Sequence, residues 1–121
     1  MINDPSMKER VGVLLAKLRR INESGAKLAA ICGGPVSLAY AGVPDGRRCT
    51  HSIEDPGEMF AKAIFSNEYF TVDRNMIIAQ GQAYPEFAIE IGKAMGVYET
   101  EKEAREDLDW SRDRKGWAEL I

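Results

Sequence analysis

The chain has 121 residues, a mass of 13.5 kDa and a formal net charge of −3. This length is that of one ordinary domain, and the acidic balance disfavours a nucleic acid or an anionic membrane surface as a partner. No apolar run approaches the ~18 residues that cross a bilayer. The N-terminus lacks the apolar core of a secretory signal, and two cysteines are too few for a disulfide framework. We therefore predict a protein of the reducing cytoplasm.

Charge divides the chain into two parts. Residues 99–121 hold eight acidic and five basic side chains and so carry the whole net charge, whereas residues 1–98 are balanced. We interpret residues 1–98 as the folded body and residues 99–121 as a charged helical tail.

The first part of the body is predicted to form a helix, a strand and a second helix. Asp4 and Pro5 are typical of a helix start, and Gly25 is typical of its end. Apolar residues at spacings of three and four predict that this helix turns one face to the core; they are Val11, Leu14, Leu15, Leu18 and Ile21. Residues 27–31 resemble a strand covered on both faces in a mostly parallel sheet. A second helix is expected from Pro35 to Gly42.

The remainder of the chain continues the alternation of strands and helices. We expect a strand over residues 47–51, a helix that opens at Asp55-Pro56 and includes Ile64, and a hairpin of residues 69–72 and 76–79. Helical spacing then runs from Phe87 to Gly96, and again over residues 100–118, where Trp110 and Trp117 lie nearly on one face. Such aromatic residues either anchor an interface or cover the protein's own body. The order of elements indicates an α/β fold.

The strongest candidate for a catalytic residue lies at the turn between the first strand and the second helix. A nucleophile on a tight strand-to-helix turn needs very small neighbours, which Gly33 and Gly34 provide beside Cys32. The start of the helix near Pro35 would favour the thiolate, and its amides would serve as donors to a developing oxyanion. The alternative is that Cys32 is an inert, buried thiol.

The residues around this turn resemble a known family. The stretch LAAICGGPVSLAYAGVPDGRRCTH is similar to the cysteine-elbow segment of the ThiJ/PfpI superfamily, within the class I glutamine amidotransferase-like fold. The likeness continues through FSNEYFTVDRNMIIAQGQAYPEFAIEIGKAM, with its hairpin, small-residue loop and Glu-Phe-Ala helix. It covers roughly residues 8–95, and the combination of these motifs is more specific than any one of them.

The resemblance implies roles for particular residues. Cys32 corresponds to the reactive cysteine and His51 to the histidine of the Thr-His pair, with Gly33 and Gly34 forming the elbow and Tyr84 beside the pocket. Gly33 and Tyr84 stand where other branches of the family carry further histidines, so glutamine hydrolysis is disfavoured. No cofactor is implied.

The resemblance also implies a partner. Members of the family carry about half of a doubly wound domain before this region, including an acidic residue beside the cysteine. We therefore expect a partial doubly wound, flavodoxin-like sheet that lacks its N-terminal strands. A parallel sheet with open edges needs covering, so we predict a homo-oligomer or a complex with a separately encoded N-terminal half. A truncation or a wrongly assigned start is the simpler alternative.

Other candidate sites are weaker. Cys49, His51 and Glu54 could suggest a metal, but the spacing matches no zinc motif. Asp73 is typical of a turn.

Three functions remain open at this stage. The first is the cysteine-bearing half of an enzyme that acts on a small carbonyl or acyl substrate through Cys32 with help from His51, as a glyoxalase or deglycase, a hydratase or a hydrolase. The second is a non-catalytic, chaperone-like module. The third is a redox sensor in which Cys32 oxidises reversibly.

Overall fold

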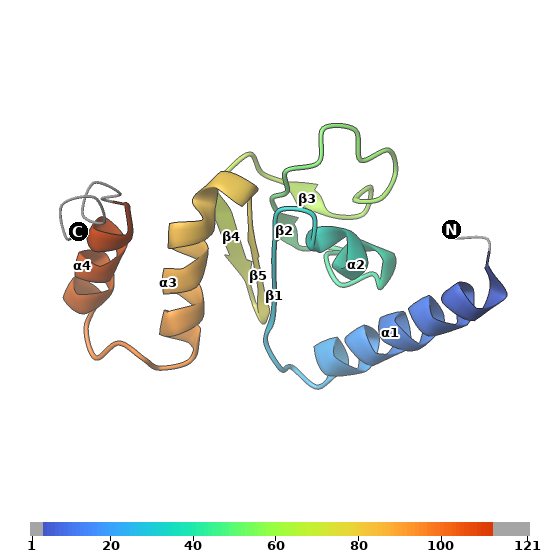
Figure 1. Ribbon diagram of the computed structural model, residues 1–121, viewed down its shortest axis with the longest axis horizontal. Helices are drawn as coiled ribbons and strands as arrows, with labels where there is room; N and C mark the ends of the chain where they lie inside the picture. Colours follow the sequence, from blue (N-terminus) through green and yellow to red (C-terminus); the bar gives the residue numbers. More distant parts are fainter. Residues whose placement is uncertain (1–3, 113–121) are drawn as a thin grey trace, which may run out of the picture.

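The computed structural model describes residues 4–112, in which helices and strands alternate as in an α/β protein (Figure 1). The elements in chain order are α1 (Pro5–Glu23), β1 (Leu28–Ile31), α2 (Pro35–Tyr40), β2 (Arg48–Cys49), β3 (Ile64–Phe65), β4 (Phe70–Asp73), β5 (Met76–Ala79), a 3₁₀ turn (Gly81–Ala83), α3 (Tyr84–Ala94) and α4 (Glu101–Arg112). No helix within this range is long and apolar enough to cross a bilayer.

The main sheet has three strands in the order β1-β5-β4. β1 and β5 are parallel, with Ile31 opposite Ala79, whereas β4 and β5 form the predicted antiparallel hairpin. A second, two-stranded parallel sheet joins β2 to β3. The α/β class is confirmed, and the register brings the ends of β1 and β5 to the same edge of the sheet.

The core lies between β1, β5 and α2. Leu28, Leu38, Met76 and Ile78 are buried there. Leu28 begins β1, but its neighbour Ala29 is exposed. The expectation that this strand is covered on both faces is therefore wrong for the described residues, because nothing within them lies over Ala29.

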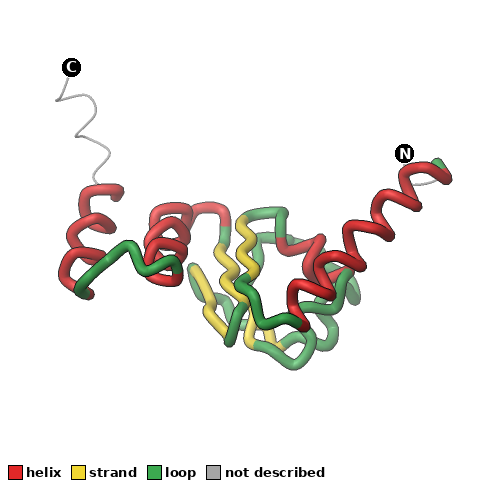
Figure 2. The backbone as a smooth tube through the Cα atoms, turned by 90° about the horizontal axis from the view of Figure 1, so that it is seen from below, coloured by secondary structure: helices red, strands yellow, loops and turns green. Residues whose placement is uncertain are grey.

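Helix α1 begins as predicted, with Asp4 as its N-cap, but its apolar face is not a core face. None of its residues is buried, and only Leu15 and Leu18 pack partly against the core. Val11 and Leu14 are 48% and 47% exposed. Figures 1 and 2 show why: α1 extends away from the sheet, with its N-terminal end farthest from the body.

The helix predicted after Pro56 is absent from the structure. Residues 56–63 form consecutive turns whose amides bond three residues back, as in Met59 N–H to the Pro56 carbonyl (3.1 Å). Gly57 has a positive φ of 58°, which interrupts a right-handed helix. Ile64 instead donates its N–H to the Arg47 carbonyl (2.8 Å), which draws the segment into β3. Pairing with β2 therefore outweighs the local helical spacing.

The strand predicted over residues 47–51 is shorter than expected. Only Arg48 and Cys49 have strand pairing, so Thr50 and His51 lie in the loop that follows. Arg47 is buried, and its Nη1 donates to Oδ1 of Asn75 (2.8 Å). The Asn75 amide also donates to the Ala26 carbonyl (2.8 Å) and so holds the chain between α1 and β1 against the hairpin.

Helices α3 and α4 lie side by side at the end of the molecule opposite α1 (Figures 1 and 2). α3 confirms the helix predicted up to Gly96, and α4 matches the part of the predicted 100–118 helix that is described. Tyr98 packs so closely on Gly92 that an added Cβ would lie 2.7 Å from its ring. Trp110 is 68% exposed, and Trp117 lies outside the described residues.

Candidate active site

The cysteine predicted to be a nucleophile occupies a tight turn at the end of β1. Cys32 is exposed and adopts a left-handed conformation, with φ of 61°, which is uncommon for a residue with a side chain. Its N–H donates to the Ala79 carbonyl at the end of β5 (3.2 Å), and the Gly34 N–H donates to the Ile31 carbonyl (2.9 Å). These bonds close the turn and hold the thiol above the edge of the sheet.

Two glycines, Gly34 and Gly81, make this turn possible. The sequence indicated Gly34 but not Gly81. A Cβ on Gly34 would lie 3.1 Å from the Ile31 carbonyl oxygen, whereas a Cβ on Gly33 would meet nothing within 4 Å. The second critical glycine is Gly81, where a Cβ would lie 3.2 Å from Cys32 Sγ. The small-residue loop before the Glu-Phe-Ala helix was the available signal for Gly81.

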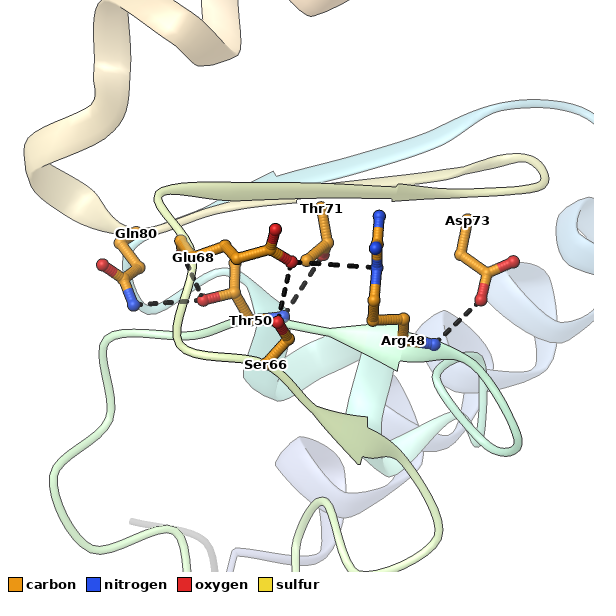
Figure 3. A network of polar contacts seen from close by, with 7 residues as sticks. All are labelled: Arg48, Thr50, Ser66, Glu68, Thr71, Asp73 and Gln80. Atoms are coloured by element: carbon orange, nitrogen blue, oxygen red, sulfur yellow. Dashed lines mark hydrogen bonds and ion pairs between the residues drawn. The ribbon is translucent and has the colours of Figure 1, made fainter.

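A buried polar network fixes the loop that carries Gly81 (Figure 3). Gln80, which is 8% exposed, donates from Nε2 to Thr50 Oγ1 (3.1 Å). The same Nε2 also donates to Oδ1 of Asn67 (3.0 Å), a residue that Figure 3 does not draw. Thr50 in turn donates from Oγ1 to the Glu68 carbonyl (2.7 Å), and its N–H donates to Thr71 Oγ1 (3.2 Å). Because such groups are costly to bury without partners, the bonds select one position for Gln80 and hence for Gly81.

Ser52 connects this loop to His51. Its Oγ accepts a hydrogen bond from the Gly81 N–H (2.8 Å), so the segment after β2 and the segment after β5 meet next to Cys32. Gly81 therefore lies between Cys32 and Ser52. Neither Ser52 nor Gln80 was singled out from the sequence, because their importance depends on pairing between distant segments.

His51 is buried beside two phenylalanine rings. Its imidazole stacks on Phe60 with ring centroids 4.5 Å apart and lies 4.7 Å from the ring of Phe65. Nδ1 accepts a hydrogen bond from the Ile53 N–H (3.1 Å), and burial lowers the pKa of His51 below its ordinary value. From these contacts we infer a neutral imidazole whose proton is on Nε2. Within residues 4–112, no hydrogen bond joins this imidazole to the Cys32 thiol.

The second cysteine has a different environment. Cys49 is 1% exposed, and burial raises the pKa of its thiol to about 11. Its Sγ donates to the Thr50 carbonyl (3.2 Å). A protonated, enclosed thiol is a poor nucleophile, so Cys49 is a packed residue of β2.

The remaining candidates lie near the start of α3. Tyr84 is the first residue of that helix and has an exposed side chain. Glu86 is buried, and one of its carboxylate oxygens accepts a hydrogen bond from Arg112 Nε (2.8 Å), which fastens α4 to α3. In the described part of the chain, no group of three or more histidine, cysteine or acidic side chains is arranged to hold a metal ion.

The fold and the turn define an α/β protein with an exposed cysteine between a strand and a helix. Residues 3–94 match the DJ-1/PfpI family, and the chain belongs to that family. The ThiJ/PfpI-like resemblance and the partial flavodoxin-like sheet expected from the sequence are thereby confirmed.

Solved structures and a curated relative share this region. A ThiJ/PfpI family protein from Bacillus anthracis matches with a TM-score of 0.72 and 24% identity, over 83% of this chain and 49% of that one. DJ-1beta of Drosophila melanogaster matches with a TM-score of 0.67 and 25% identity, over 88% and 60% of the two chains. The HTH-type transcriptional regulator GbdR of Pseudomonas aeruginosa is 32% identical over 81 residues, which are 64% of this chain and 21% of the regulator. The chain thus spans about half the length of the matching structures and a fifth of GbdR.

The contact between Gly81 and Cys32 can be tested by comparing two alanine variants. We expect Gly81→Ala to destabilise the protein by roughly 1–3 kcal/mol, the usual cost of overpacking, and to slow alkylation of Cys32 severalfold because the new methyl group shields the sulfur. Gly33→Ala is the matched control and is expected to change neither quantity. Denaturant unfolding and the rate of iodoacetamide labelling measure the two effects. Equal behaviour of the two variants would show that Gly81 does not confine the thiol.

Proposed function

We propose that this chain is the cysteine-bearing part of a DJ-1/PfpI-type enzyme that acts on a small carbonyl or acyl substrate through Cys32. The observation that carries this proposal is an exposed cysteine in a left-handed conformation, on a strand-to-helix turn bounded by Gly34 and Gly81. Strained conformations of this kind are concentrated at functional sites. A packing role would not require the sulfur to be exposed.

The chemistry begins with attack of the Cys32 thiolate on a carbonyl carbon. A carbon–sulfur bond forms while the carbonyl π electrons move to the oxygen, which becomes an oxyanion. The Gly34 N–H already donates to the Ile31 carbonyl. Gly33 is the residue directly after the nucleophile, the position whose N–H contributes to the oxyanion hole in elbow enzymes. We therefore assign the main oxyanion contact to the Gly33 N–H, with Gly34 shaping the turn.

His51 assists as a hydrogen-bond donor in this proposal. Its Nδ1 lone pair is engaged by the Ile53 N–H, so the neutral ring offers Nε2–H to an oxygen. A role as the general base would require a free lone pair on Nε2. The proton would then be on Nδ1, which could no longer accept the hydrogen bond from the Ile53 N–H. We therefore assign His51 the role of hydrogen-bond donor through Nε2–H and not the role of general base.

The acyl branch of this proposal predicts acetylation of the chain by p-nitrophenyl acetate. Thiolate attack and loss of p-nitrophenolate leave an acetyl group on Cys32, and we expect one rapid release of p-nitrophenolate per chain. Steady turnover should be slow, because the acid or base assistance worth about 10² to 10⁴ in rate comes from a carboxyl group outside this region in the family. Stopped-flow absorbance and peptide mapping measure the burst and its site.

Cysteine variants separate this reaction from background hydrolysis. Cys49→Ser is expected to retain the burst and Cys32→Ser to lose it. An unchanged burst in Cys32→Ser would contradict the proposed nucleophile, whereas rapid steady turnover that requires Cys32 would show that this chain needs no further acidic group.

We also propose that the open side of the sheet is covered by more polypeptide, either a separately encoded N-terminal half that completes the sheet or a second copy of this chain. Within the described residues β1 has only β5 as a strand neighbour. α1 has no buried side chain, and its apolar residues Val11, Leu14 and Ile21 are exposed. Exposed apolar faces and parallel edges of this kind are typical of surfaces that a partner covers. The exposed Trp110 is a second possible contact.

Size-exclusion chromatography with light scattering tests this partner. Burying about 1,000 Å² of apolar surface contributes roughly 25 kcal/mol before association costs, so we expect a dimer or larger species at micromolar concentration. Leu14→Lys should weaken the assembly, and the exposed Lys17→Glu should leave it intact. A monodisperse species of 13.5 kDa with cooperative unfolding would contradict the proposal.

A further inference from the structure

A cavity of about 380 Å³ opens beside His51, between the loop after β2 and strand β3. This volume lies in the range of small-molecule sites. Cys32 is not among the residues that line it, so binding in the cavity can be measured separately from the reaction of the thiol. Its wall combines two aromatic rings, aliphatic side chains and one imidazole.

The imidazole of His51 forms part of the wall of this cavity. His51 is 9% exposed, and Phe60, Phe65 and the Ile53 N–H hold its ring in place. Nδ1 is used by Ile53, and Nε2 makes no hydrogen bond to any residue in the range 4–112. Among these residues no fully enclosed side-chain nitrogen or oxygen lacks a partner. Nε2 is therefore reachable from outside the protein, although the ring around it is buried.

The rest of the wall restricts which molecule fits. Phe60 and Phe65 provide aromatic surface, and Ile53 and Pro56 provide aliphatic surface. The one carboxylate in the lining belongs to Glu54, which disfavours an anion. A single donor in an otherwise apolar wall is satisfied by a single acceptor on an uncharged ligand.

We propose that this cavity binds a small, uncharged molecule with an aromatic or branched apolar body and one carbonyl oxygen, which accepts a hydrogen bond from His51 Nε2–H. The apolar body packs on Phe60 and Phe65. Binding is non-covalent and does not require Cys32. Because Nε2–H is also the donor that the proposed function gives to the substrate of Cys32, this inference rests on that function: the molecule held here is that substrate, and the cavity selects its apolar group.

Two probes of nearly equal shape test the donor on the unmodified protein. Acetophenone carries the carbonyl oxygen, and ethylbenzene lacks it. We expect acetophenone to shift the backbone amide signals of Ile53, Gly57 and Ala61 saturably in ¹H–¹⁵N NMR spectra at pH 7.5. Its affinity should exceed that of ethylbenzene by roughly three- to tenfold, the net worth of one hydrogen bond. Equal affinities, or shifts scattered away from these residues, would overturn the proposal.

Three variants complete the experiment. Phe65→Ala should weaken both probes because it removes one aromatic wall. His51→Phe keeps an aromatic ring but removes the donor, so it should weaken acetophenone alone. Cys32→Ser should leave both affinities unchanged, so binding can succeed or fail independently of acetylation at Cys32. Loss of acetophenone binding in Cys32→Ser would contradict non-covalent binding in a cavity whose lining does not include the thiol.

Discussion

The candidate site depends on the left-handed turn at Cys32. Such a conformation costs about 1–3 kcal/mol for a residue with a side chain, and the end of the sheet compensates for it. The parallel register of β1 and β5 places Ile31 opposite Ala79, so the Cys32 N–H finds the Ala79 carbonyl directly across the strand end. The same register places Gly81 against the sulfur. The carboxyl ends of parallel strands are where α/β proteins commonly bind ligands, and here they meet at a thiol.

The polar core behind this edge gives the site its rigidity. Gln80 and Thr50 belong to segments separated by 30 residues, and they are joined by a hydrogen bond that neither can replace with water while buried. Ser52 then holds the Gly81 amide from the opposite side. A nucleophile and its neighbours must be held within a fraction of an ångström to be productive. The fixed loop and the fixed turn provide that constraint.

Local patterns predicted the parts of the structure that depend on local physics. The Cys-Gly-Gly-Pro sequence predicted the turn, and the residues around Asp73 predicted the hairpin, because both depend on conformational preferences of adjacent residues. The helix predicted near Ile64 failed because pairing with β2, a contact between distant segments, outweighed spacing. The prediction that α1 turns one face to the core was wrong for a related reason. Apolar spacing identifies an apolar face of a helix but does not show which part of the protein packs against it.

The candidate site could be predicted only in part. Cys32 was identified from its neighbours, and His51 from a family motif. The sequence predicted that His51 belongs to a strand over residues 47–51, but the strand ends at Cys49 and the imidazole contacts Phe60 and Phe65. Gln80 gave no local signal, because a buried glutamine is recognised only by the partners that the fold brings to it.

Competition between the two cysteines for a limiting electrophile tests the central claim most directly. Native chain at pH 8 is treated with less than one equivalent of iodoacetamide, and the modified peptide is identified by mass spectrometry, with circular dichroism confirming that the fold persists. Cys49 is enclosed, and burial raises the pKa of its thiol to about 11, so its thiolate is scarce at this pH. Cys32, by contrast, is exposed on its turn. We predict that nearly all of the label is on Cys32. Preferential labelling of Cys49 in the folded chain would contradict the account.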